Sequence, residues 1–194
     1  MAVEKSPVAW ALVPLKKYAQ FSGRAPRAEF WWFFLFMLII YCVMWFGLVG
    51  SIGGMAAAGA DPSAGMLQAM GGGMIILSLA WLAVLIPSIA VQVRRLHDTN
   101  RSGWWIGVFY LLYAVYFVLL FGSLFSMMGS SVETGVEPSP GAGGMFLVTG
   151  LLGLVMFVYG IVLLVFYCLP GTPGPNNYGS DPYGAQENLE GVFS

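Results

Sequence analysis

The stretch that decides the fold is FWWFFLFMLIIYCVMWFGLVG, residues 30–50, which contains no Asp, Glu, Lys, Arg or His. Three more stretches lack these residues, and all four are 20 to 25 residues long. A helix needs about 20 apolar residues to cross the hydrocarbon core of a bilayer. The sequence therefore predicts an all-α membrane protein with four transmembrane helices. The other three stretches are residues 74–93, 104–128 and 145–169.

The composition of the chain agrees with this class. Of the 194 residues, 58% are hydrophobic and 9% are charged, whereas an ordinary soluble domain has about 25% charged residues. The soluble alternative is a bundle of wholly buried helices. Buried helices of soluble proteins tend to be shorter and to carry polar faces, which these stretches lack.

The basic residues are sorted along the chain, although the formal net charge is only −1. All eight lie either before residue 30 or between residues 94 and 101. The charged residues of the segments 51–73 and 129–144 are all acidic. With four crossings, all eight fall on one side of the membrane. By the positive-inside rule that side is the cytoplasm. We therefore expect two antiparallel hairpins with both termini in the cytoplasm.

This topology divides the chain into three parts. Residues 1–29 form a cytoplasmic or interfacial segment, which is either a short helix in the headgroup layer or a loose tail. Residues 30–169 form the four-helix transmembrane domain, and residues 170–194 form a turn-rich cytoplasmic tail. Within the second span, Pro87 should kink the helix unless a neighbour satisfies the carbonyl that it frees. Four tryptophans should anchor the inner ends of the first and third spans at the interface, namely Trp31, Trp32, Trp104 and Trp105.

The connection between the second and third spans concentrates polar chemistry in RRLHDTNRSGWW, residues 94–105. If the helix continues into it, Arg94 and Asp98 are four residues apart and can pair. Glu29 should lie at a similar depth at the start of the first span. It is a natural partner for one of these arginines, because an unpaired carboxylate near a bilayer is costly.

Three blocks of sequence resemble the bacterial membrane-protein family called domain of unknown function 805. They are FSGRAPRAEFWWFFLF, RRLHDTNRSGWW and GPNNYGSDPYG, in this order. The resemblance covers the chain from about Tyr18 to Tyr183. It implies a small protein of the bacterial inner membrane with both ends in the cytoplasm, and it implies no activity.

By this topology the polar residues of the three blocks meet at the cytoplasmic face. We predict that the tail folds back and completes a network that binds anionic lipid headgroups or organises a membrane partner, which is either a second copy of the chain or another membrane protein. A purely structural network that locks the helices is the open alternative. The predicted network comprises Arg24, Arg27, Glu29, Arg94, Arg95, His97, Asp98, Arg101, Asn176, Asn177 and Asp181.

Two other function classes are weaker. A transporter or channel subunit would need an oligomer, because one four-helix unit leaves little room for a pore. A transport path would also favour polar groups within the membrane, but the spans contain no ionisable carboxylate, Lys, Arg or His at mid-depth. An enzyme acting on lipids would have to use the single histidine, and adjacent helical residues such as His97 and Asp98 point about 100° apart. We predict no catalytic residue, no metal site, no cofactor and no nucleic-acid partner.

Overall fold

The computed structural model describes residues 6–57, 71, 74–133 and 140–182. The chain forms two compact units. The first unit comprises Met1–Asn100 and Pro170–Ser194, and the second comprises Arg101–Leu169.

The predicted all-α fold with four long apolar helices is confirmed. All four helices are apolar and long enough to cross a membrane, and the described residues contain no strand. These helices are α2 (Arg27–Ala57), α4 (Met74–Asp98), α5 (Trp104–Glu133) and α6 (Pro140–Cys168).

The helices run further than the apolar stretches at several ends. Helix α2 continues to Ala57 and α5 to Glu133, where the sequence analysis placed loops from residues 51 and 129. A glycine inside a helix costs about 1 kcal/mol, which is less than unpaired backbone groups cost close to a bilayer. The rest of the first predicted loop, apart from residue 71, lies outside the described residues.

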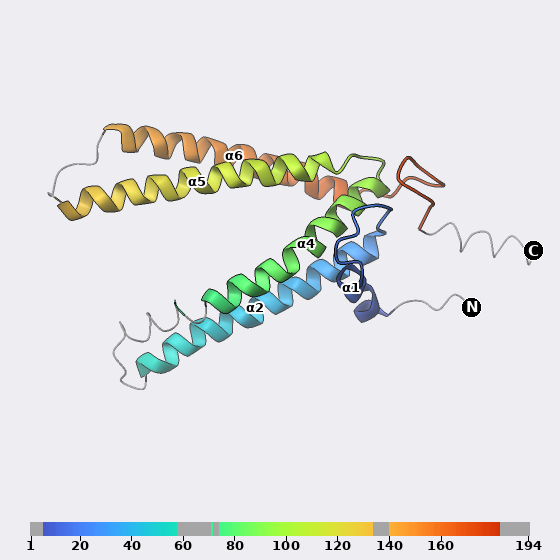
Figure 1. Cartoon of the computed structure of the whole chain (residues 1–194), viewed down its shortest axis with the longest axis horizontal. Coiled ribbons are helices and arrows are strands. Elements are labelled where there is room, and N and C mark those ends of the chain that lie inside the picture. Colours follow the sequence, from blue (N-terminus) through green and yellow to red (C-terminus); the bar gives the residue numbers. More distant parts are fainter. Residues whose placement is uncertain (1–5, 58–70, 72–73, 134–139, 183–194) are drawn as a thin grey trace, which may run out of the picture. The chain divides into compact units, whose positions relative to one another are not determined.

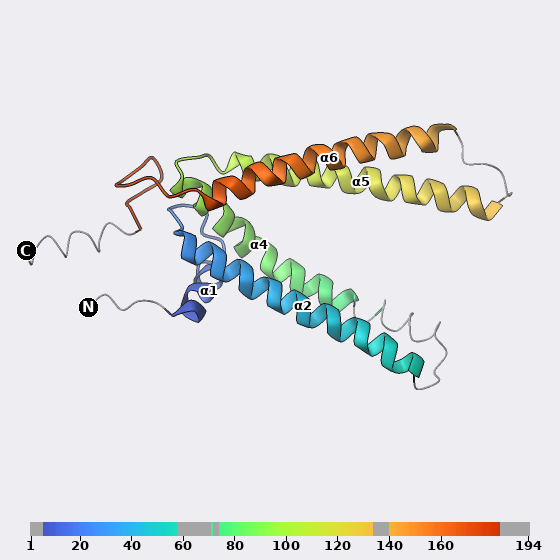
Figure 2. The same cartoon turned by 180° about the vertical axis from the view of Figure 1, so that it is seen from behind.

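The first unit is a hairpin of α2 and α4 with a short helix, α1 (Pro7–Lys16), against its open end. Both views show α2 and α4 side by side and α1 near the first turns of α2 (Figures 1 and 2). Ser6 caps α1 by accepting a hydrogen bond from the Ala9 N–H at 3.3 Å. The N-terminal segment therefore contains a short helix, and the location of this helix in the headgroup layer stays a prediction.

Proline 87 lies inside α4, as the sequence places it. It cannot donate to the carbonyl of Ala83, four residues earlier. The Tyr18 hydroxyl donates to that carbonyl at 2.7 Å. A residue just after α1 thus supplies the neighbour that the sequence analysis required.

The second unit is a hairpin of α5 and α6, which also lie side by side (Figures 1 and 2). The Tyr159 hydroxyl donates to the carbonyl of Trp105 at 2.9 Å. The guanidinium carbon of Arg101 lies 4.0 Å from the centre of the Phe166 ring. These contacts join the start of α5 to the last turns of α6.

The four helices bury very little of their apolar surface within the protein. Only 6–17% of the residues in their most apolar 18-residue windows are buried. Phe125 on α5 is 80% exposed and Phe46 on α2 is 72% exposed. A soluble protein would not expose such continuous apolar faces, so the faces match a lipid environment.

Candidate functional site

Polar residues from three distant segments meet at one end of the α2/α4 hairpin. These segments are the connection from α1 to α2, the last turn of α4, and residues 170–182 after α6, which all belong to the first unit. We call this assembly the polar cap. Its residues are Lys17, Gly23, Arg24, Arg27, Glu29, Arg94, Arg95, His97, Asp98, Gly171, Thr172, Gly174, Asn176, Tyr178 and Asp181.

The carboxylate of Asp98 is the centre of the polar cap. Its Oδ1 accepts a hydrogen bond from Nε of Arg24 at 2.9 Å, and its Oδ2 accepts one from Nη1 of Arg95. All three side chains are at most 2% exposed. Burial strengthens the attraction between opposite charges, but it also removes their hydration, so buried charged groups must bond to one another. In the polar cap the single carboxylate of Asp98 does this for two buried guanidinium groups.

Arg24 also holds the C-terminal segment. Its Nη1 donates to the carbonyl of Gly174 and its Nη2 to the carbonyl of Thr172, each at 2.6 Å. A planar guanidinium presents its donors as a rigid fork, which suits several acceptors at fixed positions. Gly23, with a positive φ of 89°, turns the chain directly before Arg24. This single side chain joins the N-terminal segment, α4 and the tail.

The tail also caps the C-terminus of α4, where a helix leaves carbonyl groups without intrahelical donors. Both the N–H and the hydroxyl of Thr172 donate to the carbonyl of Asp98, at 2.9 and 3.2 Å. The side-chain amide of Asn176 donates to the carbonyl of His97 at 2.9 Å. Gly171 packs so closely that an added Cβ would lie 2.8 Å from Cγ of Asp98. The tail residues thus complete a helix end that its own backbone leaves open.

His97 lies between the N-terminal segment and the tail. Its ring stacks on that of Tyr178, with centroids 3.9 Å apart and an interplanar angle of 4°. Its Nδ1 lies 3.2 Å from the carbonyl oxygen of Gly23. The carboxylate of Asp98 faces Arg24 and Arg95 instead. His97 and Asp98 therefore have different partners, as their helical positions predict.

A second buried ion pair joins α2 to α4. Nη1 of Arg94 lies 2.7 Å from Oε1 of Glu29, and these side chains are 1% and 2% exposed. Nζ of Lys17 lies 4.0 Å from the other oxygen of Glu29. Within the described part of the chain, Nε, Nη1 and Nη2 of Arg94 have no hydrogen-bond acceptor, so this contact is an ion pair only.

These buried ion pairs test two pairings that the sequence predicted. Glu29 does pair with one of the arginines, and that arginine is Arg94. The expected pair between Arg94 and Asp98 is wrong, because Asp98 pairs with Arg24 and Arg95. Spacing within one helix predicts only local neighbours such as Arg95 and Asp98, whereas Arg24 and Glu29 reach α4 from other segments.

A polar cleft of about 330 Å³ opens in the cap. Three arginines and two aspartates line it, together with the tail residues 170–173. If each side chain carries its usual charge, the cleft has a surplus of one positive charge. The charged residues are Arg24, Arg27, Arg95, Asp98 and Asp181.

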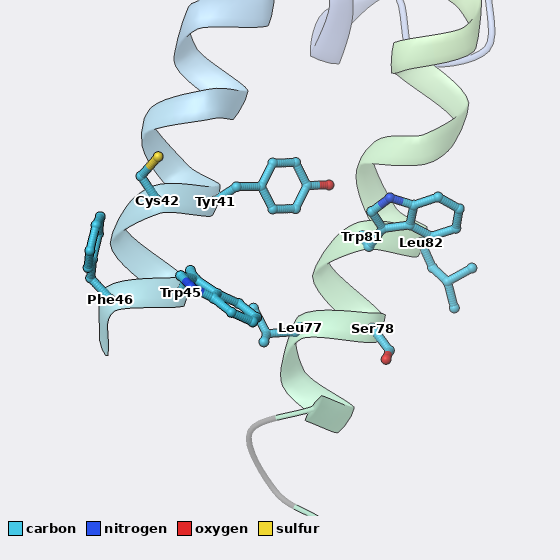
Figure 3. Close-up of a pocket in the computed structure, with 8 residues that line it drawn as sticks. All are labelled: Tyr41, Cys42, Trp45, Phe46, Leu77, Ser78, Trp81 and Leu82. Carbon is cyan, nitrogen blue, oxygen red and sulfur yellow. The ribbon is translucent and has the colours of Figure 1, made fainter. Parts of the chain in front are cut away.

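A larger apolar groove of about 760 Å³ lies between the membrane-spanning parts of α2 and α4. Its walls are four α2 residues between Tyr41 and Phe46 and four α4 residues between Leu77 and Leu82. In Figure 3, Tyr41 points from α2 towards α4. Apolar side chains at this depth match the acyl chains of a bilayer. The groove contains none of the predicted site residues.

The other predicted residues lie at different places. Asp181 accepts a hydrogen bond from the Gly174 N–H at 2.9 Å, whereas Asn177 is exposed beside the cap. Arg101 belongs to the second unit. Among the predicted anchors, Trp32 and Trp105 are both 39% exposed, Trp104 is 78% exposed and Trp31 is half-buried.

Sequence reasoning missed several residues of this assembly. Thr172 and Gly171 were read only as parts of a turn-rich tail, although both contact Asp98. Tyr18 lies in the segment 1–29, for which the sequence indicates only a short helix or a loose tail, although its hydroxyl bonds to the carbonyl of Ala83. The carbonyl that Pro87 frees was the one signal that a donor must approach α4. Nothing in the local pattern indicated which donor.

Comparison with known proteins agrees with this description. The family model described as "Protein of unknown function (DUF805)" matches residues 18–180. Inner membrane protein YhaH of Escherichia coli K12 is 31% identical over 89% of this chain and 95% of its own length. Inner membrane protein YhaI is 31% identical over 89% and 94%, and the uncharacterized protein YiiR is 29% identical over 83% and 84%. No solved structure matches the chain. This chain is therefore an integral inner-membrane protein that belongs to the DUF805 family.

Proposed function

We propose that the polar cap lies at the cytoplasmic surface of the inner membrane and binds the headgroup of an anionic phospholipid in its cleft. The observation that carries the proposal is the cleft of about 330 Å³, which three arginines and two aspartates line. Its positive surplus favours an anion, because an uncompensated charge near a bilayer is costly. Basic pockets at the cytoplasmic ends of membrane helices are a known way to hold anionic headgroups.

The residue types of the cleft favour a phosphate group. A guanidinium binds phosphate oxygens through paired N–H donors, which a lysine ammonium cannot do. The cleft contains three guanidinium groups, and the side chains of Arg24 and Arg95 are fixed by Asp98. Several of their N–H groups already donate to Asp98, Thr172 and Gly174, so a phosphate would use their remaining N–H groups together with the exposed Arg27. Side chains that are already oriented lose little conformational entropy when a ligand binds.

The position of the cleft supports a ligand at the membrane surface. Its walls are Arg24 before α2 and Arg27 at the first residue of α2, two residues in the last turn of α4, and residues 170–173 and Asp181 after α6. Apart from Asp181, these lie at or next to the ends of candidate spans. The basic residues of the chain favour the cytoplasmic leaflet for this end. A lipid phosphate in that leaflet would lie at the depth of the cleft.

The described helices do not favour the transporter alternative. The buried polar side chains within α5 and α6 are Ser123 and Thr149. Each donates to a carbonyl of its own helix, at 2.8 Å in both cases. Hydroxyl groups used in this way are satisfied within the helix and need no polar path.

The test is lipid retention by the purified full chain in native mass spectrometry, with phosphatidylglycerol competing against phosphatidylcholine. We expect Arg27→Gln to lower phosphatidylglycerol retention about fivefold, since a basic residue near an anionic surface contributes about 1 kcal/mol. The matched control is Lys16→Gln, which removes the same charge from an exposed position on α1 outside the cleft. Equal losses in the two variants would refute the cleft as the site. No preference for phosphatidylglycerol in the native chain would leave the cap with a structural role only.

A further inference from the structure

We propose that the described part of the tail, residues 170–182, is a strap whose docking on the polar cap is coupled to headgroup binding in the cleft. The inference rests on the proposed function and names the regulation of the same site. It starts from the walls of the cleft, because five of the nine lining residues belong to the tail and four to the connection after α1, to α2 and to α4. The cleft is therefore complete only while the tail is docked.

The tail is held to the cap by polar contacts rather than by an apolar core. Arg24 donates to two tail carbonyls. The side chains of Thr172 and Asn176 donate to the carbonyls of the last two residues of α4. Every residue from 170 to 182 is half-buried or exposed. Segments with few buried apolar contacts open most readily, so the tail should be able to leave the cap while the α2/α4 hairpin stays folded.

Two residues hold the tail from outside the cleft. The side-chain amide of Asn176 donates to the carbonyl of His97 and to the hydroxyl of Thr172, each at 2.9 Å. The ring of Tyr178 stacks on that of His97 with centroids 3.9 Å apart. Among the described residues that line the cleft, neither Asn176 nor Tyr178 appears. They are therefore positioning residues, which act on a ligand only through the place of the tail.

Ligand binding and tail docking are coupled because a ligand in the cleft contacts both walls. A ligand that binds only the docked form lowers the population of the released form, by one plus the ratio of the free ligand concentration to Kd. The coupling is reciprocal. A chain whose tail is docked for only a fraction of the time binds the ligand more weakly by that fraction. The docked tail should therefore report that the headgroup site is occupied.

Two backbone amides distinguish release of the tail from opening of the whole cap. The N–H of Thr172 donates to the carbonyl of Asp98 at 2.9 Å, so this bond joins the tail to α4. The N–H of Ala25 donates to the carbonyl of Arg94 at 3.0 Å, so this bond joins the N-terminal segment to α4 without the tail. Release of the tail exposes the Thr172 amide and leaves the Ala25 amide bonded.

The first experiment measures hydrogen exchange at both amides in the full chain, in nanodiscs of phosphatidylcholine with and without phosphatidylglycerol. We expect exchange at Thr172 to slow about tenfold when phosphatidylglycerol is about ten times the amount that half-fills the site. Exchange at Ala25 should change little. An equal slowing at the two amides would refute the strap, because it would show a general stabilisation of the first unit.

The second experiment loosens the tail from outside the cleft. The double variant Asn176→Ala/Tyr178→Ala removes the amide bonds and the ring stack, while the control Ser180→Ala changes an exposed side chain of the same tail. We expect faster exchange at Thr172 in the double variant, and lower phosphatidylglycerol retention in native mass spectrometry. A tail docked about one third of the time would retain about threefold less lipid. The control should keep both native values.

The outcomes separate this inference from the proposed function. If the native chain retains phosphatidylglycerol no better than phosphatidylcholine, the proposed function fails. If it retains phosphatidylglycerol but exchange at Thr172 does not slow, the proposed function survives and the coupling is refuted. Native retention in a double variant whose tail is released most of the time would refute the coupling as well. Slowing at Thr172 by soluble glycerol phosphate, and not by phosphatidylglycerol, would support the coupling with a soluble phosphate as the ligand and refute the lipid headgroup.

Discussion

The hydroxyl of Tyr18 donates a hydrogen bond to the carbonyl of Ala83 at 2.7 Å. Proline 87 leaves this carbonyl without its usual partner in α4, since proline has no N–H to donate. An unsatisfied carbonyl costs several kcal/mol in hydrocarbon. The contact explains how α4 tolerates a proline and why the segment after α1 lies against it.

Tyr18→Phe should lower the free energy of unfolding by about 1–3 kcal/mol, the cost of a polar group left without its partner. In a Pro87→Ala background the same change should cost less, because residue 87 then donates to Ala83 itself. The measurement is a double-mutant cycle by reversible unfolding in mixed micelles. Tyr113→Phe, at an exposed position on α5, is the control. Equal costs in the two backgrounds would contradict the explanation.

Glu29→Gln should strongly destabilise the first unit. It leaves the buried guanidinium of Arg94 without its countercharge, and breaking a buried pair in this way costs about 3–5 kcal/mol. The double variant Glu29→Gln/Arg94→Met removes both charges and should recover most of that loss. Unfolding free energies measured in the same micelles test this. If the double variant is as unstable as Glu29→Gln, the ion pair is not the cause.

Arg24→Lys should release the tail while keeping the positive charge. One ammonium group cannot reproduce the three bonds that Arg24 makes to Asp98, Thr172 and Gly174, because lysine lacks the planar fork. We expect the amide of Thr172, which bonds to Asp98, to exchange hydrogen at least about tenfold faster. Lys16→Arg should leave this exchange unchanged. An unchanged rate in Arg24→Lys would show that charge alone holds the tail.

Gly171→Ala should also release the tail, in this case by a steric clash. The added Cβ would lie 2.8 Å from Cγ of Asp98 and 2.9 Å from its Oδ1, so either the tail or the carboxylate must move. Gly160→Ala is a matched control, since a Cβ there meets nothing within 4 Å. Faster exchange at Thr172 in the first variant and native exchange in the second is the expected result. Native exchange in both would mean that the tail absorbs the methyl group.

The transmembrane architecture could be predicted because it depends on one simple property. A long charge-free stretch such as residues 30–50 fits the hydrocarbon core of a membrane, and this fit does not depend on which residues pack against it. The sequence also predicted that Glu29 pairs with one of the arginines of residues 94–105, because a carboxylate near a bilayer must be neutralised. These inferences use the cost of burying charge, which does not depend on details of packing.

The pairings inside the polar cap could not be predicted in the same way. Arg94 and Asp98 have the spacing of a helical pair, yet the structure pairs Arg94 with Glu29 and Asp98 with Arg24 and Arg95. Which partner a side chain chooses depends on how distant segments are placed. A single sequence carries no measure of that placement.

The sidedness of the polar cap is open to a direct chemical test. Ser22 before α2 and Asn177 in the tail are both exposed near the cap, whereas Gly54 is exposed near the other end of α2. If all the basic residues face the cytoplasm, as the positive-inside rule predicts, single cysteines at positions 22 and 177 should react with an impermeant maleimide in inverted vesicles only. A cysteine at position 54 should react in intact spheroplasts. The native Cys42 and Cys168 are free thiols and would first be replaced by serine. Labelling of positions 22 and 177 from opposite sides would refute the meeting of the N-terminal segment and the tail at one surface, and with it the proposed site.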